Sequence, residues 1–140
     1  MTRVKKLHVI ATTVLLAVSV LVILLWLSWA DTMSALRHDT ERWAVVVDHA
    51  GSRMAIEPSS DEVWAQMIQV HQNQSTRFVG GIVERYGNKW GFRFRPDSVA
   101  VAKFTAEGLQ ATIRYVSENL DYWLGGWAYV SGKVVEVHSP

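Results

Sequence analysis

The stretch RFVGGIVERYGNKWGFRFRPDSV, Arg77 to Val99, predicts a β-hairpin and decides the class of the fold. In its second half, large aromatic residues alternate with glycine and arginine, which is the period of two of a strand with one buried face. Gly87 and Asn88 tolerate the positive φ angles of a tight turn, and Pro96 removes a donor from the strand ladder. We therefore expect two antiparallel strands, and a core contact for the aromatic face, which consists of Trp90, Phe92 and Phe94.

The opposite face of this hairpin carries the cations Arg93 and Arg95, and Arg85 and Lys89 lie nearby in the sequence. Guanidinium groups bind carboxylates and phosphates through paired hydrogen bonds. A cluster of these four side chains therefore predicts a surface for an anionic ligand or partner. A solvated sheet face is the alternative, because exposed charges commonly do nothing more than face water.

The flanking segments predict the other elements of a small α+β domain. Ser59, three residues before Glu62, is typical of a helix start, and the glycine pair after Leu124 is typical of a helix end. Period alone does not decide between strand and helix for residues 98–109. The expected elements outside the hairpin are a strand at Trp43–His49, a helix at Ser60–Gln72, a third strand or helix at Ser98–Leu109, a helix after a Thr112 cap and a strand at Lys133–Val137. The expected order is β-α-β-β-β-α-β, with one mixed or antiparallel sheet packed with two helices.

The N-terminal segment predicts a single transmembrane helix. Residues 7–30 contain no Asp, Glu, Lys or Arg over about 24 residues, enough at about 1.5 Å per residue to cross a hydrocarbon core. Three cations precede the run and Asp31 follows it, so the positive-inside rule predicts a cytoplasmic N-terminus at 1–6. A polar spacer at 31–42, read as a continuation of the helix, then leads to an extracytoplasmic domain at 43–138. The expected location is the cell membrane, with the lipid bilayer contacted through residues 7–30.

A cleaved signal peptide is the alternative for the same segment. Ser28 and Ala30 are small residues at the positions that a signal peptidase prefers, which would make the mature protein secreted. The apolar run is, however, well beyond the roughly 7–15 residues of a signal-peptide core. An uncleaved signal anchor is therefore the preferred interpretation.

Composition and motifs exclude several classes of function. A net charge of +1 gives no basic field for nucleic acid, and a chain without cysteine has no disulfide and no thiolate metal site. The five histidines include no pair three or four residues apart, as a helical metal motif requires. No nucleophile elbow or phosphate loop is present. We expect no catalytic residues, no metal and no cofactor.

An ordered set of residues resembles a known family, over roughly residues 43–137. The set runs through a glycine-containing strand, a Trp-x-Phe strand, a Pro-Asp-Ser segment, a glutamate and a helix with Tyr-Val and Leu-Asp. It is similar to the N-terminal domain family of the calmodulin-binding proteins of social amoebae, which also occurs in small bacterial proteins. The family's cysteine positions hold Leu109-Gln110 and GGWAYVSG here. The matching positions are Gly81, Trp90, Phe92, Pro96, Asp97, Ser98, Glu107, Tyr115, Val116, Leu120 and Asp121.

Two classes of function follow from these features. The first is a membrane-anchored extracytoplasmic binding or accessory module for a protein partner or a small anionic ligand. The second is a hydrolase-like enzyme with a site assembled from Glu107, Asp48, His49 and the hairpin arginines. The predicted binding residues of the first class are Arg85, Lys89, Arg93, Arg95 and Glu107.

Overall fold

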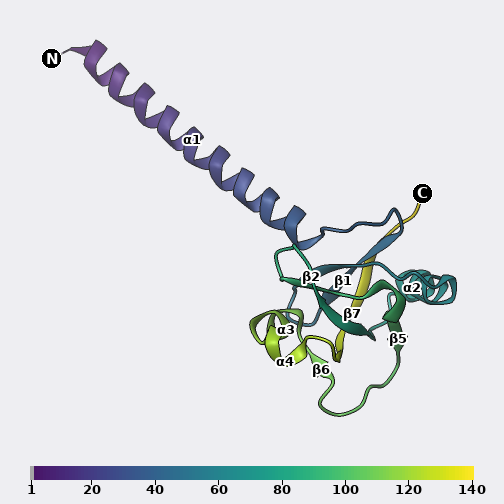
Figure 1. Cartoon of the computed structure of the whole chain (residues 1–140). Helices are drawn as coiled ribbons and strands as arrows, with labels where there is room; N and C mark the ends of the chain where they lie inside the picture. Colours follow the sequence, from purple (N-terminus) through teal and green to yellow (C-terminus); the bar gives the residue numbers. More distant parts are fainter. Residues whose placement is uncertain (1) are drawn as a thin grey trace. The chain divides into compact units, whose positions relative to one another are not determined.

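The computed structural model describes residues 2–140 and divides into two compact units, one that ends at Met33 and one from Ser34 to Pro140. The first unit is nearly all of helix α1 (Arg3–Ala35), the purple and blue helix of Figure 1. Its most apolar window has a mean hydropathy of 2.8, so α1 is long and apolar enough to span a membrane. Cleaved signal sequences share these properties, so the helix alone does not distinguish an anchor from a signal peptide. The predicted spacer is helical only through Ala35, and residues 36–42 are not helical.

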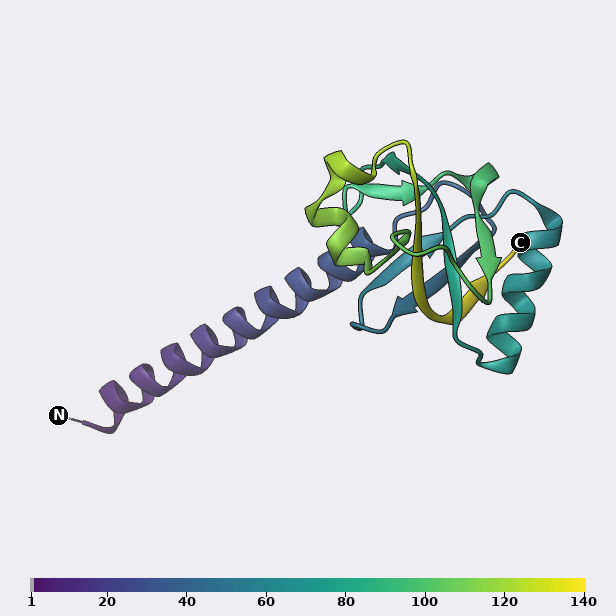
Figure 2. The same ribbon diagram turned by 90° about the horizontal axis from the view of Figure 1, so that it is seen from below.

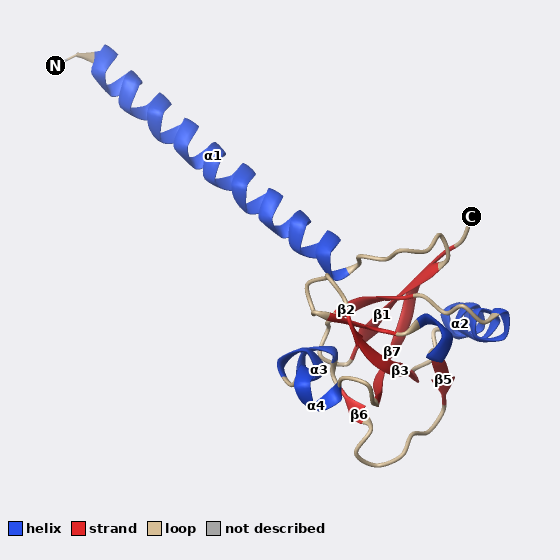
Figure 3. Ribbon diagram, viewed as in Figure 1, coloured by secondary structure: helices blue, strands red, loops and turns tan. Residues whose placement is uncertain are grey.

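The second unit is an α+β domain, as predicted (Figure 3). It contains one sheet, three helices and one 3-10 turn, η1. The strands are β1 (Trp43–Asp48), β2 (Arg53–Ile56), β3 (Arg77–Arg85), β4 (Phe92–Phe94), β5 (Ala100–Ala102), β6 (Gln110–Ala111) and β7 (Trp127–His138). The helices are α2 (Asp61–Asn73), α3 (Ile113–Glu118) and α4 (Leu120–Trp123), and η1 is Pro96–Ser98.

The sheet is built around its last strand. The strand order is β2-β1-β7-β3-β4, with β5 added to β3 and β6 to β7. The neighbours are antiparallel except for β6, which runs parallel to β7. The strands at the two ends of this order, β2 and β4, also contact each other. The sheet is therefore curved until its ends meet, which encloses the core.

The hairpin prediction is confirmed in its strands and corrected in its turn. β3 and β4 pair antiparallel, with Glu84 opposite Arg93. The connection is longer than a two-residue turn, because the Tyr86 N–H donates to the Gly91 carbonyl across the loop. The Asn88 side chain fixes this loop by donating to Phe92 O and accepting from the Trp90 N–H.

Other predicted elements differ from the structure in number and length. The sequence order omitted β2, which follows the turn at Gly51, and residues 98–109 contain the short strand β5 followed by a loop. Helix α2 is capped by Ser60, whose hydroxyl accepts from the Val63 N–H, and not by Ser59. The helix after the Thr112 cap is divided into α3 and α4 at Asn119. The last strand is twelve residues long and not five.

The core takes side chains from the strands and from the helices. Trp90, Phe92 and Phe94 are buried, as predicted, and meet strand residues such as Val79 and Val130. Helix α2 and the α3–α4 pair lie on opposite sides of the strands (Figures 1 and 2). The helix residues that complete the core are Trp64, Met67, Val70, Ile113, Val116 and Trp123.

We expect Trp90→Ala to lower the free energy of unfolding by about 3–5 kcal/mol, because it leaves a large cavity in a closed core. It also removes the hydrogen bond from the Trp90 indole N–H to the Arg53 carbonyl, at 2.8 Å. Trp127→Ala is the matched control, since Trp127 is 40% exposed and should cost about 1 kcal/mol. Urea denaturation of the detergent-solubilised protein, followed by circular dichroism, measures both. Equal losses would contradict the placement of Trp90 in the core.

Candidate functional site

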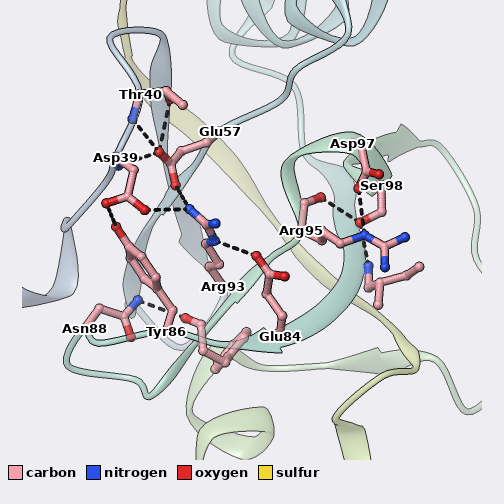
Figure 4. Close-up of polar contacts among 12 residues, drawn as sticks. Asp39, Thr40, Glu57, Glu84, Tyr86, Asn88, Arg93, Arg95, Asp97 and Ser98 are labelled. Carbon is pink, nitrogen blue, oxygen red and sulfur yellow. Dashed lines mark hydrogen bonds and ion pairs between the residues drawn. The ribbon is translucent and has the colours of Figure 1, made fainter.

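The most densely connected polar cluster surrounds Arg93, in the middle of β4 (Figure 4). Its Nε donates to Glu84 Oε1 at 2.7 Å, and its Nη1 donates to Glu57 Oε2 and Asp39 Oδ2, both at 3.1 Å. The Arg93 side chain is only 21% exposed. Sequence reasoning placed it on an open, solvated face, and the structure corrects this because three carboxylates surround it.

Glu57, directly after β2, is the buried member of this cluster. Its side chain is 2% exposed, and burial of a carboxylate is costly unless donors surround it. Oε1 accepts from the Asp39 N–H at 2.6 Å, the Thr40 N–H at 2.9 Å and the Thr40 hydroxyl at 3.0 Å. Together with Arg93 on Oε2, these donors satisfy both oxygens. The segment that follows α1 is thereby fastened to the domain.

Tyr86 covers the exposed side of the cluster. The Arg93 guanidinium lies 4.6 Å from the centre of the Tyr86 ring, and the Tyr86 hydroxyl donates to Asp39 Oδ1 at 2.9 Å. Burial raises the pKa of Tyr86 to about 12, and its hydrogen bond to Asp39 acts in the same direction. Burial lowers the pKa of Arg93, but Glu84 and Glu57 outweigh it and the pKa is raised. The tyrosine therefore stays neutral and the arginine charged at physiological pH.

The cluster closes the sheet. Glu57 follows β2 and Arg93 lies on β4, so their ion pair joins the two strands that end the strand order. The hydrogen bond from the Trp90 indole to the Arg53 carbonyl makes a second link between the same regions. Arg93 has carboxylate partners on two of its nitrogens already, so the cluster acts as a structural clasp and not as an open anion site.

The other predicted binding residues do not gather on one surface with Arg93. Arg85 lies opposite Phe92 in the register, so it points to the other side of the hairpin, where it pairs with Asp121 at 3.4 Å. Arg95 pairs with its neighbour Asp97 at 2.7 Å. Lys89 lies over the ring of Trp90, with Nζ 5.0 Å from the ring centre.

Glu107, the fifth predicted binding residue, lies exposed in the loop between β5 and β6. Within residues 2–140, no ion pair joins it to a hairpin cation. The structure therefore separates the five residues into at least three places. Their role in binding stays a prediction.

The residues of the enzyme alternative are also divided. Asp48 and His49 line an open cavity of about 310 Å³, but neither Glu107 nor a hairpin arginine is among its lining residues. The Asp48 carboxylate is buried and accepts three backbone N–H groups, from Ala50, Ser52 and Ile113. It fixes the β1–β2 turn to the start of α3. In the described part of the chain, no three His, Cys, Asp or Glu residues are placed to hold a metal ion.

Several residues of the family resemblance form one structural unit where β3, β4 and β5 meet. The Ser98 hydroxyl accepts from the Ile82 N–H at 2.8 Å and donates to the Arg95 carbonyl at 2.7 Å (Figure 4). A Cβ atom on Gly81 would lie 2.8 Å from the Ser98 hydroxyl and 3.1 Å from Phe94 Cβ. Glycine at 81 thus makes room for the serine that supplies the missing ladder partner.

A comparison with protein families decides the assignment. The family model for the N-terminal domain of the social-amoeba calmodulin-binding protein type matches residues 40–139. The chain belongs to this family. The match confirms the resemblance and covers the α+β domain from Thr40, so the family's domain includes Glu57, Arg93 and one of the connector residues bound to Glu57. No curated protein and no solved structure matches the chain.

Sequence reasoning missed Asp39, Glu57 and Tyr86, which complete the cluster. The available signal was weak: Glu57 follows the apolar residues Met54 to Ile56 and precedes a proline, so its position at a strand end was open to inference. Nothing in the local sequence indicated that Arg93 would be its partner. The pair joins residues 36 positions apart, and only the closure of the sheet brings them together.

We expect Arg93→Gln to destabilise the α+β domain by about 3 kcal/mol, because it leaves the buried Glu57 carboxylate without its cation. Arg95→Gln is the matched control on the same hairpin and should cost less than about 1 kcal/mol, since its pair with Asp97 is exposed. Urea denaturation of the two full-length variants measures the difference. Similarly small losses would show that the cluster around Arg93 is only a solvated surface.

Proposed function

We propose that the protein is a membrane-anchored module whose α+β domain lies outside the cytoplasm and binds a partner there. The observation that carries the proposal is α1, which is apolar enough to span a membrane and has Arg3, Lys5 and Lys6 at its start. Cations on the short side of a single span favour a cytoplasmic N-terminus. The domain then follows on the other side of the bilayer.

The connector supports a role at the membrane surface. Residues 36–42 are the only chain between the end of α1 and the first strand, and Asp39 and Thr40 are bound to Glu57. A connector fixed in this way leaves little free chain for the domain to move along. We infer that the domain acts close to the bilayer, as an accessory or binding module for something located there.

The proposed binding surface for an acidic protein partner is formed by the exposed hairpin cations outside the clasp. The side chains of Arg85 and Arg95 are 69% and 46% exposed, and each pairs with a single exposed carboxylate. Exposed pairs of this kind contribute about 0–1 kcal/mol, so an acidic partner can replace Asp121 or Asp97 at little cost. Lys89 adds a third cation at the hairpin loop.

We expect externally added protease to remove the domain from intact cells and to leave a membrane-retained fragment that contains α1. A tag before Arg3 marks this fragment, and a tag after His138 marks the domain. Permeabilised cells provide the control for cleavage of both. Protection of the C-terminal tag would reverse the orientation, and a mature N-terminus at Asp31 would show that the helix is a cleaved signal peptide.

We expect Arg85→Gln with Arg95→Gln to lower partner recovery from native membranes without unfolding the domain, because the exposed cations would no longer attract an acidic surface. Recovery by the unchanged protein should fall as salt rises, since exposed charges are screened beyond about 8–10 Å at physiological ionic strength. Arg114→Gln, an exposed cation on α3, is the matched control. Recovery is measured by cross-linking in isolated membranes at low and high salt. Equal recovery throughout would eliminate the hairpin surface.

A further inference from the structure

A second basic region lies away from the hairpin, in an open cleft of about 290 Å³ between α2, the start of β3 and β5. Figures 1 and 2 show α2 beside β5, and the two elements contact each other. The volume is at the lower limit of small-molecule sites in proteins, so the cleft suits a small ligand. Its apolar floor is formed by Val70, Val101 and Ala102, and the other lining residues are Gln66, Gln69, Asn73, Ser75, Arg77 and Lys103.

The cleft holds two cations and no acidic side chain. Arg77 begins β3 and Lys103 directly follows β5, and neither takes part in an ion pair within residues 2–140. The guanidinium of Arg77 donates to the Thr76 carbonyl at 2.9 Å. This differs from the hairpin, where Arg85, Arg93 and Arg95 each have a carboxylate partner.

The register makes this arrangement of charges unfavourable without an anion. Phe78 pairs with Ala102 in the antiparallel ladder of β3 and β5, so one further step places Arg77 across from Lys103. Like charges at directly opposed positions destabilise a strand pair. An anion between them would remove this repulsion and would accept hydrogen bonds from both groups. The two cations thus mark the place for an acidic group.

The α2 side of the cleft supplies a different chemistry. Gln66, Gln69 and Asn73 lie three and four residues apart, which places them on one face of the helix. Each amide offers two donor hydrogens and an acceptor oxygen. A hydroxyl group both donates and accepts, so a row of amides fits a molecule with several hydroxyls. The Ser75 hydroxyl extends this polar lining.

We propose that this cleft binds a small acidic sugar, with its carboxylate or phosphate between Arg77 and Lys103 and its hydroxyls against the α2 amides. The site lies on other residues than the hairpin surface and goes beyond the partner binding proposed above. A purely structural role for the cations is the competing explanation, because positive charges near the C-terminal end of α2 complement its dipole. That role predicts effects on stability and none on ligands.

The test is isothermal titration calorimetry on the full-length protein in a detergent without a sugar headgroup. The probes are glucuronate, glucose 6-phosphate, neutral glucose and inorganic phosphate. We expect at least one acidic sugar to bind at least tenfold more tightly than both glucose and phosphate. A preference for glucuronate identifies a carboxylate ligand, and a preference for glucose 6-phosphate identifies a phosphorylated one. Absence of binding by all four probes at millimolar concentration would overturn the proposal.

Variants separate the two halves of the site. Arg77→Gln and Lys103→Gln should each weaken binding of the acidic sugar at least tenfold. The exposed pair Gln66→Met with Gln69→Met should weaken the acidic sugar at least tenfold while phosphate binding stays within twofold. Arg114→Gln is the control and should change nothing. Equal binding of phosphate and acidic sugar, unaffected by the amide variants, would overturn the assignment to a sugar.

Two further measurements keep this result separate from the hairpin surface and from a structural role. The hairpin variant Arg85→Gln with Arg95→Gln should bind the acidic sugar with unchanged affinity, whatever its effect on partner recovery. Thermal denaturation of Arg77→Gln and Lys103→Gln shows whether these variants fold. A lowered melting temperature together with no sugar binding by the unchanged protein would assign the two cations to the helix end.

Discussion

The ion pair between Glu57 and Arg93 is the interaction on which the closure of this domain depends. It joins the two end strands of a sheet that has no backbone ladder between them, and it does so from a carboxylate that is almost fully buried. Desolvation of such a pair is repaid only when every oxygen and nitrogen is satisfied. Here the connector residues Asp39 and Thr40 complete the set of donors. Closure of the sheet and attachment of the connector are therefore the same event.

The fold could be predicted where periodicity was strong and not where tertiary contacts replaced it. The strict alternation in Trp90 to Phe94 gave the buried face correctly, because one-sided burial of a strand requires that period. Strand β2 has four residues, too few to show a period. In β7, glycine at 132 interrupts the apolar run, yet the strand continues, because a Cβ there would meet the Val47 carbonyl of the neighbouring strand.

The candidate sites were predictable only as residue types. The hairpin cations are conspicuous in the sequence, but their partners come from four different segments, and Arg93 is used inside the structure. The cleft cations Arg77 and Lys103 lie 26 positions apart and share a site only because β3 and β5 are paired. The amides of α2 were present in the helical pattern, where apolar spacing drew attention to the buried face. Pairing of strands, unlike period, is not written locally.

The position of β7 in the sheet has a consequence for how the chain is made. β7 lies between β1 and β3, yet it is the last strand of the domain to be synthesised. Until it emerges, the chain holds only two separate groups, β1 with β2 and β3 with β4 and β5, and the non-local pairings that join them are the slow ones. A polypeptide with this order stays extended while it is threaded across a bilayer behind its first helix. It closes into a globule only after the final segment has passed through.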